Sequence, residues 1–95
     1  MTAYVIVDTQ ITDQQTYDDY KRQVGPVITR FGGRFLVRGG KHAVLEGSWA
    51  PHRLVVLEFP TMEALTAWYN SPEYAPLLAL RQSAARCDLL AVEGS

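Results

Sequence analysis

A chain of 95 residues is long enough for one domain with a modest hydrophobic core and too short for two. Its formal net charge of −1 gives no electrostatic reason to expect binding to nucleic acid or to an anionic membrane surface. The single cysteine, Cys87, cannot form an internal disulfide, and no basic leader or long apolar run is present, so we expect a cytoplasmic protein without a signal peptide or transmembrane helix.

The first part of the chain is predicted to form a strand and a long helix. β-Branched and aromatic residues at 4–7 indicate the strand. Thr12 and Gln15 have the spacing of a capping box, and an apolar stripe at helical spacing extends from there to Phe31, where a pair of glycines follows. Proline removes one helix hydrogen bond, so we expect a kink or break at Pro26.

The rest of the chain alternates apolar runs with turn residues. Paired glycines after the second strand suggest a bulge or a bend, beyond which the strand resumes. Ser71 and Pro72 have the cap and first-turn positions of a final helix. The predicted elements are a strand at 35–37 that resumes at 43–45, a strand at 53–59, helices at 62–69 and 72–81, and a strand at 87–92.

The element order predicts an α+β, ferredoxin-like βαββαβ fold for residues 1–95, with helices on one face of a four-stranded antiparallel sheet. The strands carry apolar residues on both faces, as Val5 and Val7 against Tyr4 and Ile6 show. A sheet with one face in water would alternate apolar with polar residues. We therefore infer a homodimer, in which a second copy covers the face without helices.

Four segments of the chain are similar to a known family. They are residues 32–40, 45–49, 53–60 and 68–74, the last followed by Arg81. Together they resemble the small bacterial proteins catalogued as domain of unknown function thirteen-thirty. The resemblance implies a protomer of the dimeric α+β barrel superfamily, whose sheets pack on one another. That superfamily includes cofactor-independent monooxygenases, isomerases, decarboxylases and dehalogenating enzymes, and the family itself carries no agreed catalytic residues.

Charged residues inside the strands are the candidate catalytic groups. Period-two alternation places Arg34 and Arg38 on one face, and we expect them to point toward the space between the sheets together with Glu58 and Asp8. The guanidinium groups would bind a carboxylate or enolate, and Glu58 or Asp8, its pKa raised by burial, would act as the base. The alternative is a set of structural ion pairs at the dimer interface.

Aromatic residues near the break between the last two helices are candidate ligand contacts. Tyr69 and Tyr74 flank that break and are predicted to reach the rim of a pocket, together with Trp49. Arg81 would bring a further cation to this pocket; alternatively, its stem would pack on apolar residues and only its charged end would reach water. Trp68 falls on the apolar stripe of its helix and is predicted to belong to the core.

These residues favour a cofactor-independent homodimer that binds or transforms a small carboxylate-bearing or aromatic metabolite. The alternative is a structural or regulatory dimer with no ligand. The RNA-recognition motif shares this element order, but the strands lack its paired stacking aromatics and the chain is not basic, so no nucleic acid is expected. His42 and His52 have no third ligand at a suitable spacing, so no metal site is predicted.

Overall fold

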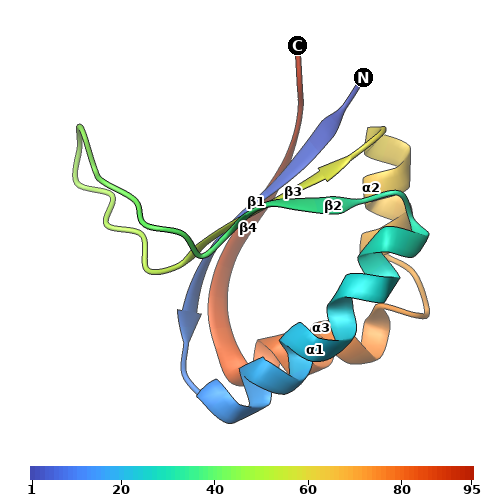
Figure 1. The fold of residues 1–95 in the computed structure, drawn as a ribbon, viewed down its shortest axis with the longest axis horizontal. Coiled ribbons are helices and arrows are strands. Elements are labelled where there is room, and N and C mark those ends of the chain that lie inside the picture. The colour runs from blue at the N-terminus through green and yellow to red at the C-terminus, as the bar shows by residue number, and fades with distance from the viewer.

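In the computed structural model, which describes residues 1–95, three helices cover one face of a four-stranded antiparallel sheet (Figure 1). The strand order is β2-β3-β1-β4, which confirms the predicted ferredoxin-like fold. The strands are β1 (Ala3–Ile11), β2 (Arg34–Arg38), β3 (Leu54–Phe59) and β4 (Ala85–Glu93), and the helices are α1 (Gln14–Arg30), α2 (Met62–Tyr69) and α3 (Ala75–Ala84).

Helix α1 differs in two details from the sequence prediction. Its N-cap is Asp13, whose carboxylate accepts a hydrogen bond of 3.2 Å from the Thr16 backbone N–H, so the predicted cap at Thr12 is wrong by one residue. The helix also continues through Pro26 without interruption. Pro26 and the preceding turn at Arg22 are exposed, so water can satisfy the carbonyl that loses its helix partner.

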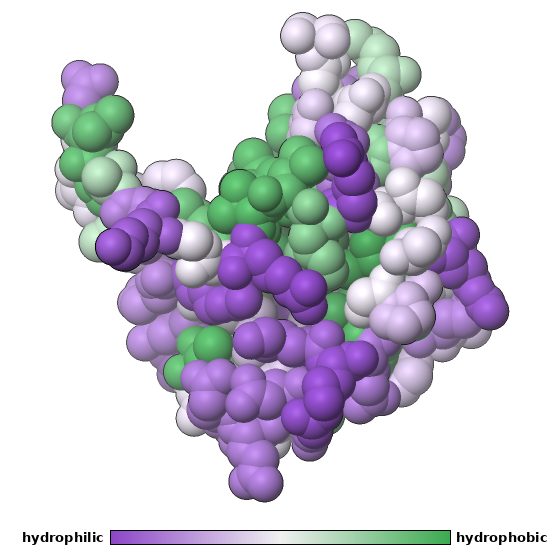
Figure 2. Space-filling model, viewed as in Figure 1, coloured by the Kyte–Doolittle hydropathy of each residue, from purple (hydrophilic) through white to green (hydrophobic).

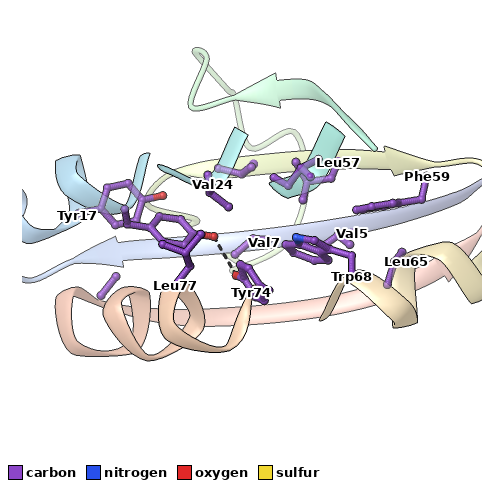
Figure 3. Close-up of a cluster of buried hydrophobic side chains, with 14 of the residues drawn as sticks. Val5, Val7, Tyr17, Val24, Leu57, Phe59, Leu65, Trp68, Tyr74 and Leu77 are labelled. Atoms are coloured by element: carbon purple, nitrogen blue, oxygen red, sulfur yellow. Dashed lines mark hydrogen bonds between the residues drawn. The ribbon is translucent and has the colours of Figure 1, made fainter. Parts of the chain in front are cut away.

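The hydrophobic core lies between the helices and the sheet. Alternate residues of the two central strands point into it, among them Val5 and Val7 of β1 and Leu57 of β3 (Figure 3). Trp68 of α2 is 1% exposed, which confirms its predicted place in the core. Its indole is stacked between two other buried rings, with centroids 5.3 Å from that of Phe59 and 4.3 Å from that of Tyr74. The core therefore holds Trp68 in a fixed orientation.

A bulge in β2 changes which residues share a face of the sheet. The register shifts between Phe35 and Val37, and beyond this point Arg38 lies opposite the buried Val55. One extra residue reverses the alternation of all that follow it, so Arg38 lies on the helix-covered side of the sheet. The prediction that Arg38 shares a face with Arg34 is therefore wrong, because that prediction assumed an uninterrupted pleat.

The connection between β2 and β3 forms no strand, so the predicted strand at 43–45 is also wrong. Residues 40–51, here called the arm, extend away from the body of the molecule (Figure 1). Their backbone groups take part in none of the protein's 53 backbone–backbone hydrogen bonds. An apolar run alone cannot make a strand here, because no neighbouring strand lies within reach to pair with it.

The face of the sheet that carries no helix, here called the open face, is substantially apolar. Residues that alternate with the core-facing set supply it, and its outer strands expose the most: Leu36 is 43%, Leu90 54% and Val92 44% exposed. Figure 2 shows hydrophobic atoms both on the arm and on the body beside it, separated by a notch. The sheet is thus apolar on both faces, as the sequence pattern predicted.

Gly33 joins α1 to β2 where the chain passes closest to the core. A Cβ atom at this position would lie 2.5 Å from Cε1 of Phe59 and 2.8 Å from Cγ2 of Ile28, both of which are buried. We expect Gly33→Ala to lower the free energy of unfolding by about 1–3 kcal/mol in urea denaturation, because the core must shift to accept a methyl group. Gly40→Ala is the control, since a Cβ there has no neighbour within 4 Å. Equal effects of the two substitutions would contradict this packing argument.

Candidate functional site

A cavity lies inside the helix–sheet layer and is lined by side chains from every strand and every helix. Its volume is about 40 Å³. One buried water needs roughly 10–15 Å³ measured in the same way, so the cavity has room for about three waters in this conformation. Most of its lining is apolar, with a few polar groups that converge on one another, which is the usual composition of a small-molecule site.

Three buried side chains form a hydrogen-bonded chain in the wall of the cavity. Residues three apart on a helix share a face, so Tyr17 and Tyr20 of α1 both point into the core. The hydroxyl groups of Tyr20 and Tyr74 are 2.9 Å apart (Figure 3), and Nε of Arg81 donates to the Tyr74 hydroxyl at 3.3 Å. Tyr74 therefore links α1 to α3 through its hydroxyl group.

Arg81 is a buried cation without an anionic partner. Arg81 is 6% exposed, and it takes part in none of the four ion pairs of the structure. Burial acts to lower the pKa of Arg81, but its interactions with Tyr74 and, to a smaller extent, with Cys87 together outweigh this and the pKa is raised, so the group stays charged. A buried charge without a counter-charge is costly. The cavity therefore contains an uncompensated positive charge.

The indole N–H of Trp68, a residue of the cavity wall, lacks a hydrogen-bond partner. It is the one buried side-chain nitrogen or oxygen with no hydrogen-bond partner. Such groups are rare, because an unmade hydrogen bond in the interior costs about 1–3 kcal/mol. Since stacking on Phe59 and Tyr74 fixes the ring, the donor cannot turn elsewhere to find an acceptor. An acceptor atom that reaches this N–H would satisfy it.

More cations line the cavity where it approaches the surface, at what we call its mouth. Cζ of Arg38 lies 4.1 Å from the centre of the Phe35 ring, and Arg53 donates to the Tyr17 hydroxyl at 2.9 Å. Lys21 of α1 adds a further ammonium group. With Arg81, four cationic residues line the cavity, and no Asp, Glu or His does. This concentration of one sign is marked in a chain whose net charge is −1.

Two phenols of the cavity, those of Tyr17 and Tyr20, are donors rather than bases. Burial raises the pKa of Tyr20, and the neighbouring Tyr74 raises it further. Burial also raises the pKa of Tyr17, against the opposing effect of Arg53. Both phenols are therefore protonated near neutral pH. The cavity offers cations and hydrogen-bond donors but no ionised base of its own.

Three of the predicted site residues, Arg38, Tyr74 and Arg81, meet in this cavity. Tyr69 does not line it, although its ring lies against that of Tyr74 with centroids 6.0 Å apart. Trp49 lies on the arm, on the other side of the sheet. The cavity also brings in residues that the sequence reading did not propose as ligand contacts: Thr9, Tyr17, Tyr20, Lys21, Arg53 and Trp68. For Tyr17 and Tyr20 the sequence did contain a signal, since both are tyrosines on the apolar stripe of α1, where a core residue is more often aliphatic.

The other predicted charges lie on the open face. Nε of Arg34 donates to Oε1 of Glu58 at 2.8 Å. The sheet itself separates this pair from the cavity, because both residues sit on the side away from the helices. Their catalytic roles stay predictions, and the geometry shows a strand-to-strand ion pair.

Asp8 also faces away from the cavity and anchors the base of the arm. Its carboxylate accepts hydrogen bonds from the His52 backbone N–H at 2.8 Å and from the Trp49 indole at 3.4 Å. Burial acts to raise the pKa of Asp8, but these bonds outweigh it and the pKa is lowered. The predicted rise in pKa is therefore wrong for Asp8, since a carboxylate that accepts several hydrogen bonds is stabilised in its charged form. Its role as a base stays a prediction.

Comparison with known proteins gives the family. The model of the Domain of unknown function (DUF1330) family matches residues 2–95. The chain belongs to this family. No functionally curated protein matches the sequence. This DUF1330 chain has no helix long and apolar enough to cross a membrane, and no group of three or more of its His, Cys, Asp or Glu side chains is placed to hold a metal ion.

Solved structures share the fold at low sequence identity. A protein of unknown function from Rhodopseudomonas palustris matches 99% of this DUF1330 chain and 82% of its own, with 20% identity and a TM-score of 0.80. SnoaB, a cofactor-independent oxygenase from Streptomyces nogalater, matches 99% and 92% with 10% identity and a TM-score of 0.64. A dimeric ferredoxin-like protein of unknown function from Jannaschia sp. CCS1 matches 99% and 100%, with 13% identity and a TM-score of 0.66.

Proposed function

We propose that this DUF1330 protein is a cytoplasmic homodimer that binds a small carboxylate-bearing aromatic metabolite in the helix–sheet cavity, with no cofactor. The observation that carries the proposal is the composition of the cavity wall, with four cationic residues, an unpaired indole N–H and no acidic residue. An anionic ligand would compensate the charge of Arg81, and its oxygen atoms would offer an acceptor to Trp68. Guanidinium suits this role because it presents a planar fork of donors to a carboxylate.

The wall also limits the chemistry of the ligand. Because no ionised base lines the cavity, the ligand must arrive already charged, as a carboxylate does near neutral pH. The rings of Trp68, Tyr74 and Tyr20 favour a flat apolar body behind the charged group. Any reaction would then use the cations to stabilise negative charge that spreads from the bound anion, as cofactor-free catalysis requires. The shared fold with a cofactor-independent oxygenase supports a proposal of this kind.

Entry of such a ligand requires the mouth to open. The volume of about 40 Å³ is too small for an aromatic ring. The mouth residues Lys21, Arg38 and Arg53 have long side chains that are at least partly exposed. Arg81, deeper in the wall, is fixed by Tyr74. We expect the mouth arginines to swing outward as the ligand enters and to close over it.

The homodimer is supported by the apolar open face and by the dimeric neighbour of the same fold from Jannaschia. One alternative role is favoured by a specific contact. The ion pair between Arg34 and Glu58, 2.8 Å long on the open face, fits the reading of the strand charges as dimer-interface pairs. We therefore assign Arg34 and Glu58 to the interface and Arg81, with Trp68, to the ligand.

Ligand binding can be followed through the fluorescence of Trp68. The chain has two tryptophans, so Trp49→Phe leaves Trp68 as the only one. We expect aromatic carboxylates to change its emission in a saturable way, because their oxygen would accept from the indole N–H. Amides and amines of the same ring systems serve as matched controls and should not saturate. A response that amines share, or none with any carboxylate of a broad panel, would contradict the proposal.

A further inference from the structure

The arm is the part of the molecule that the cavity does not explain. It extends from the body without a backbone hydrogen bond, and Leu45 near its tip is 90% exposed. Ordering the backbone costs about 1–2 kcal/mol of conformational entropy per residue, and an exposed leucine contributes no burial free energy to offset that cost. Val44 and Trp49 are also exposed, at 49% and 60%. A defined position for the arm therefore requires an apolar surface outside its own chain.

The apolar surface of the arm is continuous with that of the open face. Trp49 folds back from the arm, donates its indole N–H to Asp8 at 3.4 Å, and lines one hollow together with Ile6 and Leu90 of the open face. Trp49 also lines a second hollow, which arm residues including Leu45 form almost entirely. Trp49 thus connects the two surfaces, and the notch between them is visible in Figure 2. One partner that covers the open face would contact the arm as well.

The shape of this surface selects the partner. A protruding arm and a notch lie on the same side of one chain, and a twofold axis would place each arm in the notch of the other copy. The net charge of −1 gives little repulsion between two copies, and the charges of Arg34 and Glu58 on the open face are paired. Two carboxylates, Asp8 and Asp88, line the hollow beside Trp49, so uncharged side chains such as Val44 and Leu45 fit there better than acidic ones. A nucleic acid would require a basic surface, which the open face lacks. A second copy of this chain fits both features at once.

We propose that the arms of the homodimer are exchanged, with Val44 and Leu45 of each arm packed in the notch of the partner. This inference rests on the homodimer of the proposed function and adds a link to the ligand. Arg38 and Arg53, two of the mouth residues of the cavity, flank the arm on either side, and Nη2 of Arg53 donates to the Arg38 carbonyl at 3.4 Å. An arm held by the partner holds both arginines at the mouth. The cavity of a lone protomer lacks that restraint.

Shortening the arm tests the exchange. Gly39 N–H donates to the Leu54 carbonyl, so β2 and β3 can be joined by a tight turn when residues 41–51 are replaced by Asn-Gly. We expect this variant to be a folded monomer in sedimentation equilibrium and circular dichroism, while the unmodified chain is a dimer. A dimer as tight as the unmodified one would overturn the arm exchange and leave the homodimer standing. A monomeric unmodified chain would overturn both.

Leu45→Asp tests the same contact with one substitution. A carboxylate buried in the notch is costly, and Asp8 and Asp88, which line the hollow there, would repel it, so we expect dimer dissociation to become at least about tenfold easier. Ala79→Asp is the control, because Ala79 is exposed on α3, on the helix side of the sheet. It should leave the dimerisation constant unchanged. Equal weakening by both substitutions would point to added charge rather than to the arm and would contradict the proposal.

An intermolecular contact can be observed directly without relying on any variant. In a dimer mixed from isotope-labelled and unlabelled chains, filtered nuclear Overhauser effects report only contacts between the two copies. We expect them between the Leu45 methyl groups and the methyl groups of Leu90 or Val92 on the open face. Intermolecular effects that involve the open face but never Leu45 would overturn the exchange of arms.

Discussion

Replacing Arg81 with methionine should remove ligand binding while leaving the fold as stable as before or more so. In the free protein the Arg81 guanidinium is buried, charged and without an anion. Exchanging such a group for an apolar side chain of similar length is neutral or stabilising, by up to about 4 kcal/mol in known cases. Most buried-residue substitutions lower stability, so this direction distinguishes a binding residue from a structural one.

The loss of affinity should be large. Truncating one partner of a buried, hydrogen-bonded charge pair costs about 2–5 kcal/mol, which corresponds to a loss of roughly 30-fold or more at 1.4 kcal/mol per factor of ten. Trp68 fluorescence titration with an aromatic carboxylate measures it, and thermal melting measures the stability. Arg30→Met is the matched control, since Arg30 is exposed and its ion pair with Glu73, at 3.6 Å, is of little value. The assignment fails if Arg81→Met unfolds the protein or binds carboxylates normally.

The fold could be predicted because its signals are local and periodic. The central strands β1 and β3 are apolar on both faces, and the apolar stripe of α1 has helical spacing over four turns. Each of these elements could therefore be predicted from its own residues alone. The turn at Ser71 and Pro72 lies between α2 and α3, as predicted. The predicted start of the last helix at Pro72 is wrong, however, because α3 begins at Ala75 with Tyr74 at its N-cap. Once the element order was known, the ferredoxin-like arrangement had few competitors.

The site was harder to predict because it depends on pairing. A bulge in β2 is a single residue without a partner, and it moved Arg38 from the open face to the cavity. The run at 43–45 has the composition of a strand, but pairing partners decide whether a strand forms, and the arm has none. Trp68 was correctly placed in the core, yet its unpaired N–H depends on which atoms surround the ring. A sequence pattern contains no such information.

Tyr74→Phe should destabilise the protein far more than Tyr20→Phe, although each removes one hydroxyl group. The Tyr74 hydroxyl contacts both the Tyr20 hydroxyl and Nε of Arg81, so its loss leaves two buried polar groups without a partner. A buried unsatisfied group costs about 1–3 kcal/mol, and more when it is charged, so we expect a loss of about 2–5 kcal/mol for Tyr74→Phe. Tyr20→Phe leaves the bond between Tyr74 and Arg81 intact and should cost about 1 kcal/mol, the net value of one hydrogen bond.

A double-mutant cycle identifies which orphaned group carries the cost. In the Arg81→Met background only the Tyr20 hydroxyl loses its partner when Tyr74 becomes phenylalanine, so the cost of that step should fall by about 0.5–3 kcal/mol. Urea unfolding of the four variants measures the difference, and the phenyl ring keeps the stacking on Trp68 in each of them. If the cost is the same in both backgrounds, Arg81 does not depend on Tyr74. If it falls, Tyr74 is the group that holds the buried Arg81 guanidinium in place.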